Sequence, residues 1–131
     1  LMDEHIESGD QVVIISGGYE SYLRHFKDIY KVRACYGTKI GFKNGICTGL
    51  FDGKDCMKEN KIEALEHFRD ELGASDAPTV CYTDSISDLP ILKYVDEPIV
   101  VSCCQSQEWA KSNNFKEIVW QYPQEEFKDE L

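Results

Sequence analysis

The sequence lacks any long apolar run, and this absence excludes one class of protein. A membrane-spanning helix needs about 20 consecutive apolar residues, and no stretch of the 131 residues approaches that length. The opening residues also lack the apolar segment of a signal peptide. Hydrophobic residues make up 42% of the chain, enough for a globular core. We therefore expect a cytoplasmic protein that makes no contact with membranes.

Basic residues are scarce relative to acidic ones. Lys and Arg number 14 against 24 Asp and Glu, which gives a net charge of −10 at pH 7. Such a surface repels the phosphates of nucleic acids, so we expect no nucleic-acid partner. A small anionic substrate fits the same composition, because a local site can be positive on an acidic protein.

The cysteines lack the CxxC spacing that zinc and redox sites use. We interpret them as reduced, mostly buried thiols of a cytosolic protein. They are Cys35, Cys47, Cys56, Cys81, Cys103 and Cys104. The last four residues spell KDEL, an endoplasmic-reticulum retention signal. Without a signal peptide, we interpret this ending as chance.

Strand patterns alternate with helical patterns along the chain, without internal repeats or low-complexity linkers. Strands are predicted at residues 11–16, 32–37, 77–84, 97–103 and 116–122, the first and third of them buried, and helices at 20–30, 60–73, 87–95 and 106–114. Asn44-Gly45 predicts a hairpin over residues 39–51. This alternation is typical of a parallel sheet covered on both faces. We predict one α/β domain over residues 1–131, Rossmann-like with three α/β/α layers, a mostly parallel sheet and a small hairpin.

Ser16-Gly17-Gly18 follows the first predicted strand, where open α/β sheets bind their ligands. Glycines let a backbone approach a ligand closely, and the amides of a following helix start attract an anion. The Ser16 hydroxyl adds a donor. These three residues alone fit an anion cradle and a simple tight turn equally well.

Lys61 lies in the first turn of the predicted helix that Asn60 opens, with Glu63 completing a capping pattern. A cation is slightly unfavourable there because the helix dipole is already positive at that end. A lysine beside a helix start is nevertheless a good way to hold a dianion. The alternative is a solvated surface lysine.

Asp84 ends a predicted strand, and Asp88 follows four residues later where the next helix begins. Two carboxylates so close together repel unless a cation or hydrogen bonds compensate. Mg²⁺ suits them, because it takes hard oxygen ligands and often bridges to a substrate phosphate. The alternative is that Asp88 or Ser87 only caps the helix. Together with the anion cradle and Lys61, such a pair indicates phosphoryl transfer.

Three stretches resemble a known family in order and spacing. They are VVIISGGYESYL, GICTGLFDGKDCMKENKIEAL and YTDSISDLPIL. They are similar to the second, third and fourth motifs of the haloacid dehalogenase superfamily, most of all to its phosphoserine phosphatase-like branch, and the likeness extends to about Val101.

The resemblance implies a role for each motif residue. Ser16 and the Gly17 amide would bind phosphoryl oxygens, and Lys61 would neutralise the phosphoryl group and an aspartyl-phosphate intermediate. Asp84 would bind Mg²⁺, and Asp88 would support that ion directly or through water. Thr83 stands where family members usually have glycine.

The family's first motif is missing from these residues. Its DxDx(T/S) strand carries the aspartate that attacks phosphorus and a second aspartate that serves as acid and base, and the chain contains no DxD. The helical cap after that motif is missing too. The family places this strand between those that carry Ser16 and Asp84, so without it backbone groups would go unpaired. We expect an incomplete core, the C-terminal part of a longer protein or one completed by another chain.

The resemblance therefore implies a Mg²⁺-dependent phosphatase acting on a small phosphorylated metabolite. This chain would hold the phosphate and the metal, and the nucleophile would lie elsewhere. One alternative is a non-catalytic phosphate-binding or regulatory module. Another is a phosphotransferase or phosphomutase, because the same core serves those reactions.

Overall fold

The computed structural model describes residues 1–122, which fall into two compact units, residues 1–77 and the residues from 78 onward. Each unit has a parallel sheet of its own. The predicted single domain stays a prediction, since compact units can still fold together. The KDEL ending lies outside the described residues. Within residues 1–122, no helix has the length and apolar character needed to cross a membrane.

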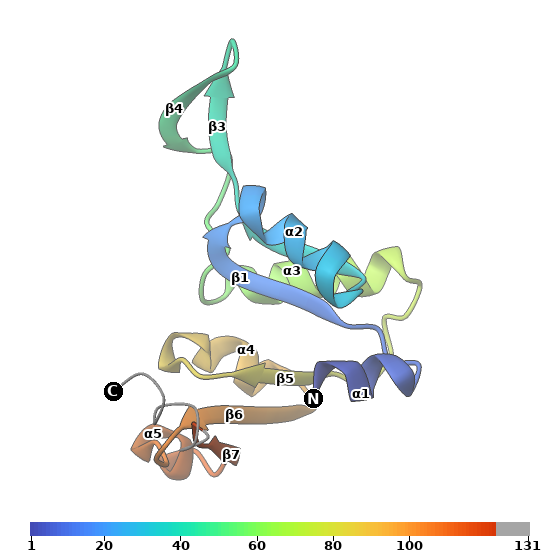
Figure 1. The fold of residues 1–131 in the computed structure, drawn as a ribbon, viewed down its shortest axis with the longest axis vertical. Coiled ribbons are helices and arrows are strands. Elements are labelled where there is room, and N and C mark those ends of the chain that lie inside the picture. Colours follow the sequence, from blue (N-terminus) through green and yellow to red (C-terminus); the bar gives the residue numbers. More distant parts are fainter. Residues whose placement is uncertain (123–131) are drawn as a thin grey trace, which may run out of the picture. The chain divides into compact units, whose positions relative to one another are not determined.

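The first unit is built on two parallel strands. Its elements are α1 (Met2–Glu7), β1 (Val13–Tyr19), α2 (Glu20–Tyr30), β2 (Ala34–Thr38), β3 (Ile40–Lys43), β4 (Ile46–Phe51) and α3 (Asn60–Glu71). Strands β1 and β2 pair in parallel, and α2 connects them. Figure 1 shows α2 on one side of this strand pair and α3 on the other. The two helices therefore cover the two faces of the pair.

Helix α2 has the bounds that its apolar spacing predicts. Its buried residue is Leu23, and the helix ends at Tyr30, followed by Lys31, whose backbone adopts the left-handed conformation with φ of 57°. That conformation stops helical hydrogen bonding and turns the chain back toward β2. Helix α1 was not predicted, because its short sequence MDEHIE buries no residue and so carries no periodic apolar signal.

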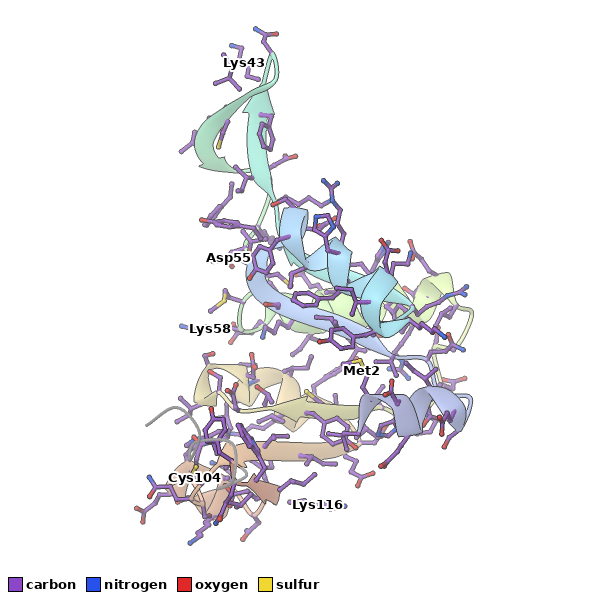
Figure 2. The ribbon with its side chains drawn as sticks, viewed as in Figure 1. Met2, Lys43, Asp55, Lys58, Cys104 and Lys116 are labelled. Atoms are coloured by element: carbon purple, nitrogen blue, oxygen red, sulfur yellow. The ribbon has the colours of Figure 1, made fainter. Side chains whose placement is uncertain are left out.

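The hairpin also forms where it was predicted. Strands β3 and β4 pair antiparallel, and Lys43 pairs with Ile46 across the turn. Asn44 and Gly45 both have positive φ, 55° and 78°, as a two-residue hairpin turn requires. Figure 2 labels Lys43 at the tip.

The second unit has a three-stranded parallel sheet in the order β5-β6-β7. Its elements are β5 (Val80–Thr83), the short 3₁₀ helix η1 (Ile86–Asp88), α4 (Leu89–Tyr94), β6 (Glu97–Cys103), α5 (Glu108–Ser112) and β7 (Lys116–Trp120). Its core packs Leu92, Val100 and Ala110 against Trp109 and Phe115. The predicted α/β class, with mostly parallel strands and a small hairpin, is confirmed.

Two predicted buried strands are less buried than their sequences suggest. The residues of β1 from Val13 to Gly18 are half-buried, and Val80 in β5 is 42% exposed. Within the described residues, β1 pairs only with β2 and β5 only with β6. Both are edge strands, so apolar sequence that would suit the middle of a sheet stays partly open to solvent.

Candidate functional site

Ser16, Gly17 and Gly18 form a bulge inside β1 rather than a turn after it. Ile15 pairs with Tyr36 and Tyr19 pairs with Thr38, so these three residues lie opposite the single residue Gly37. The predicted strand end at residue 16 is therefore wrong, because the strand continues to Tyr19. A bulge at the carboxyl end of a strand re-aims its residues, as bulges beside ligand sites often do.

Gly37 is required for this bulge to form. A Cβ atom on it would lie 2.6 Å from the Gly18 carbonyl oxygen and 2.9 Å from the Glu20 amide nitrogen. Both contacts are with backbone, which cannot rotate away. The sequence signal for the bulge therefore includes a glycine on the neighbouring strand.

The Ser16 hydroxyl is held in place by the bulge itself. Its oxygen accepts a hydrogen bond of 3.0 Å from the Gly18 amide. The hydroxyl proton is left to donate to a ligand, whereas the Gly18 amide is already engaged. That Gly17 and Gly18 also bind a ligand stays a prediction.

Thr38 connects the bulge to the segment before α3. The Thr38 hydroxyl donates to the Gly17 carbonyl at 2.9 Å and accepts from the Cys56 amide at 3.0 Å. Thr38 is 2% exposed, so both bonds are shielded from water. This role was not predictable from the sequence, since a threonine that ends a short strand is ordinary.

We expect Thr38→Val to destabilise the protein, because the Gly17 carbonyl and the Cys56 amide would lose their partner at nearly constant side-chain volume. Each buried group left without a bond costs about 1–3 kcal/mol. Urea denaturation should show this loss in the free energy of unfolding. The control is Thr38→Ser, which keeps the hydroxyl; an equal loss in both variants would contradict the explanation.

Cys56 is near both Ser16 and Lys61. Burial raises the pKa of the Cys56 thiol, and the positive charge of Lys61 and a hydrogen bond from the Ser16 backbone oppose that rise. Ser16 and Lys61 therefore both act on one buried thiol. The net increase keeps Cys56 protonated at neutral pH, which makes it a poor nucleophile.

Lys61 lies in the first turn of α3, as predicted, but the helix does not start with the predicted capping pattern. Glu59 is the N-cap and makes no side-chain capping bond. The Asn60 side chain instead donates to the carbonyl and carboxylate oxygens of Asp55, at 2.9 and 3.1 Å. Figure 2 labels Asp55 and Lys58 in this connection. The Asn60 bonds fix the entry into the helix and hence the position of Lys61.

In the second unit, Asp84 follows β5 directly and is exposed, whereas Asp88 is buried at 6% exposure. Asp88 accepts a short hydrogen bond from the Thr83 hydroxyl, which itself accepts from the Ser85 amide at 3.2 Å. Thr83, the departure from the family pattern, thus ties the strand end to Asp88. A glycine could not make these bonds.

The capping alternative for Asp88 and Ser87 is wrong. Ser85 is the N-cap of η1, and its hydroxyl oxygen accepts from the Ser87 amide at 3.3 Å. Asp88 precedes α4 but makes no side-chain capping bond there. The Asp88 carboxylate is therefore not needed to start either helix.

The donor atoms of Asp84 and Asp88 suit Mg²⁺. Both are hard carboxylate oxygens, and Mg²⁺ is commonly held by one or two carboxylates together with water and substrate phosphate. Within residues 1–122, no group of three or more His, Cys, Asp or Glu side chains forms a metal cluster. That Asp84 and Asp88 hold Mg²⁺ stays a prediction.

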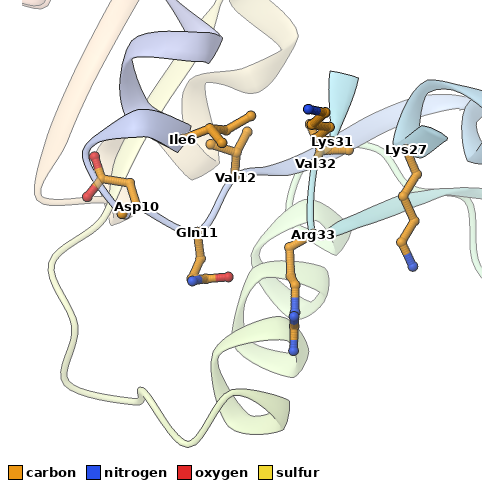
Figure 3. A pocket seen from close by; sticks show the side chains of 9 residues that line it. Ile6, Asp10, Gln11, Val12, Lys27, Lys31, Val32 and Arg33 are labelled. Atoms are coloured by element: carbon orange, nitrogen blue, oxygen red, sulfur yellow. The ribbon is translucent and has the colours of Figure 1, made fainter. Parts of the chain in front are cut away.

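A cavity of the first unit lies away from these residues. It has a volume of about 560 Å³, and Lys27, Lys31 and Arg33 are among its lining residues. Figure 3 shows it beside the segments that lead into β1 and β2. Ligands of open α/β sheets bind at the carboxyl ends of the strands, so this cavity at the amino ends is not the candidate site.

The cysteine prediction needs correction. All six thiols are free, as predicted. They are not mostly buried, since Cys47, Cys103 and Cys104 are exposed and only Cys56 is buried. Apolar neighbours in sequence predicted burial, but the hairpin and the end of β6 leave their residues in contact with solvent.

The predicted site residues fall into two groups. Ser16 and Lys61 both lie near Cys56 in the first unit, and Asp84 and Asp88 follow the same strand end in the second. That all four side chains share one pocket stays a prediction.

Comparisons with known proteins agree with these motifs. The sequence pattern of the haloacid dehalogenase-like hydrolases matches residues 1–93. A histidinol-phosphatase of Neisseria meningitidis serogroup C (strain 8013) is 31% identical over 106 residues, which cover 78% of this chain and 48% of that protein. The chain thus spans about half the length of this curated relative.

Solved structures share the fold at lower sequence identity. A protein of unknown function from Bordetella pertussis Tohama I has a TM-score of 0.77 at 21% identity, with 89% of this chain and 54% of that one covered. A probable phosphoserine phosphatase from Vibrio cholerae has a TM-score of 0.74 at 15% identity, with 89% and 35% covered. The family pattern, which matches most of the sequence, decides the assignment: the chain belongs to the haloacid dehalogenase-like hydrolases.

Proposed function

We propose that this chain is part of a Mg²⁺-dependent phosphatase that hydrolyses a small phosphomonoester. One observation carries the proposal: the Ser16 backbone hydrogen-bonds the buried Cys56 thiol and the charge of Lys61 acts on the same thiol, so both residues are near Cys56. In a chain of this hydrolase family, a serine hydroxyl and an ammonium group in the same neighbourhood are suited to a phosphoryl group. The curated relative named as a histidinol-phosphatase supports the same activity.

In this proposal, each residue has a defined task. The Ser16 hydroxyl donates a hydrogen bond to a phosphoryl oxygen, and the Lys61 ammonium offsets the charge of the phosphoryl group. Asp84 and Asp88 would hold Mg²⁺, with Thr83 orienting the Asp88 carboxylate. When bound, Mg²⁺ supplies positive charge that stabilises the transferring phosphoryl group. Catalysis of this kind is mainly positioning and charge neutralisation.

The nucleophile of the proposed reaction is an aspartate outside these residues. Its carboxylate oxygen forms a bond to phosphorus while the ester P–O bond breaks, and the departing alcohol oxygen takes a proton from a second acid. Water then attacks phosphorus and gives up a proton to that same group. The bond to the aspartate breaks, which releases phosphate and restores the carboxylate.

β1 and β5 are edge strands of their sheets within the described residues, and this supports the proposal of an additional strand. β1 and β5 each have one strand partner within the described residues, and each leads at its carboxyl end to a pair of the proposed site. We propose that a strand carrying DxDx(T/S), from the same polypeptide or another chain, completes the core. The free thiols fit a cytoplasmic location for the assembled enzyme.

Phosphate release from a panel of phosphomonoesters tests the proposal. The panel includes histidinol phosphate and phosphoserine, with Mg²⁺ or EDTA, and compares the complete gene product with the 131 residues alone. We expect Mg²⁺-dependent release from the complete product and none from the 131 residues. Equal turnover by both would contradict an external nucleophile. A complete product without DxDx(T/S) and without turnover would favour the non-catalytic binding module.

A further inference from the structure

Gln107, the residue just before α5, reaches the backbone of Asp84. Its side-chain nitrogen Nε2 donates to the Asp84 carbonyl oxygen at 3.2 Å and to the Ser102 hydroxyl at 3.1 Å. Its oxygen Oε1 accepts from the Trp109 ring nitrogen at 2.7 Å. The Gln107 amide therefore has a partner on both ends, which fixes its orientation.

The carboxylate of Glu117 holds two groups that fix Gln107 in place, its backbone amide and the Ser102 hydroxyl. Glu117 of β7 accepts from the Ser102 hydroxyl at 2.6 Å and from the Gln107 backbone amide at 2.8 Å, and also from the Ser106 hydroxyl. Hydrogen bonds from Ser102, Ser106 and Gln107 lower the pKa of Glu117, so the group stays ionised at neutral pH. An ionised acceptor makes these bonds strong.

The network joins Glu117 of β7 to the carboxyl ends of β6 and β5. Ser102, fully buried on β6, donates to Glu117 on β7 and accepts from Gln107. Gln107 then reaches the residue that follows β5. Because the polar groups of this network are paired with one another, the network can hold the Asp84 backbone in one place.

We propose that Gln107 is a positioning residue for the Mg²⁺ site, holding the Asp84 carbonyl so that the adjacent carboxylate is set for the ion. This inference rests on the proposed function, which assigns Asp84 to Mg²⁺. The Asp84 side chain is exposed, so its direction depends mainly on the backbone. Partners one step beyond the ligands typically change metal affinity 10–100-fold when they are removed.

The test is Gln107→Met, which keeps the side-chain length and removes the amide. Isothermal titration of the complete gene product with MgCl₂ alone should show an affinity about tenfold weaker than in the unsubstituted protein. The matched control is Gln105→Met, at an exposed glutamine two residues earlier, which should leave the Mg²⁺ affinity unchanged. Amide hydrogen exchange should speed up at residues 85–88 more than elsewhere in the second unit.

Trp109→Phe provides a second variant that perturbs packing less. It removes the donor to Gln107 while keeping an aromatic ring against Phe115, whose centroid lies 6.3 Å away. Mg²⁺ affinity should also fall, but by less than in Gln107→Met. This variant decides the question if Gln107→Met does not fold.

Asp84→Asn separates this inference from the proposed function. If Asp84→Asn loses Mg²⁺ binding while the folded Gln107→Met and Trp109→Phe proteins bind the ion normally, Gln107 has no positioning role and the proposed function stands. If Asp84→Asn binds Mg²⁺ normally, the metal assignment is wrong and the inference is overturned with it. Uniformly faster exchange with unchanged affinity would indicate a purely structural role.

Discussion

Asp84→Asn is expected to abolish Mg²⁺-dependent turnover in the complete enzyme. Removal of a direct ligand should weaken Mg²⁺ binding by more than about a hundredfold. Removal of a residue that only supports a ligand already lowers metal affinity about 10–100-fold. The fold should survive, because the Asp84 side chain is exposed and its bond to Gln107 uses the backbone carbonyl. Phosphate release and calorimetric Mg²⁺ titration measure the two effects.

The control for Asp84→Asn is Asp76→Asn, which removes the same charge from an exposed position in the connection before β5. It should retain both turnover and Mg²⁺ affinity. If the two variants behave alike, the loss comes from net charge rather than from the site. Normal turnover in Asp84→Asn would show that the metal ligand has been assigned to the wrong residue.

Lys61→Met is expected to give the second large effect. It keeps most of the side-chain stem but removes the charge that would offset the phosphoryl group. Loss of one such stabilising contact typically lowers kcat about 10²–10³-fold. The same substitution should raise the pKa of Cys56 further, because Lys61 then no longer opposes the effect of burial.

Two measurements test the Lys61 prediction. Steady-state kinetics give kcat, and the pH dependence of Cys56 alkylation reports its pKa without any turnover. Lys27→Met serves as the control, since Lys27 lies in the last turn of α2, toward the amino ends of the strands. Unchanged kcat together with an unchanged Cys56 pKa would place Lys61 away from the site.

Local sequence signals were sufficient where local physics decides the structure. The helix at 20–30, the strand at 97–103 and the Asn44-Gly45 turn all have the predicted bounds. Each depends on residues close together in the chain: apolar spacing, a continuous apolar run, or a turn dipeptide. The positions of Lys61, Asp84 and Asp88 at element ends were predictable for the same reason, whereas Ser16 lies inside β1 and not at its predicted end.

Contacts between distant residues were not predictable. The bulge at Ser16 depends on Gly37 of the neighbouring strand, and Thr38 bonds to Gly17 and Cys56 across the fold. Gln107 reaches Asp84 only because both lie at the carboxyl ends of adjacent strands. Without a partner nearby in sequence, these side chains look like ordinary polar residues.

Thr83 shows how the structure can explain a departure from a motif. From sequence alone, a threonine in place of glycine suggests a changed loop. In the structure, its hydroxyl bonds both Asp88 and the Ser85 amide. The substitution therefore adds a support for the acidic pair.

A crystal structure of the complete protein with Mg²⁺ and inorganic phosphate would test the central claim most directly. We predict that phosphate oxygens lie about 3 Å from Ser16 Oγ and Lys61 Nζ, and that Mg²⁺ is bound by Asp84 beside Asp88. Phosphate and Mg²⁺ bound far from these four side chains, or the two pairs on separate surfaces, would contradict it.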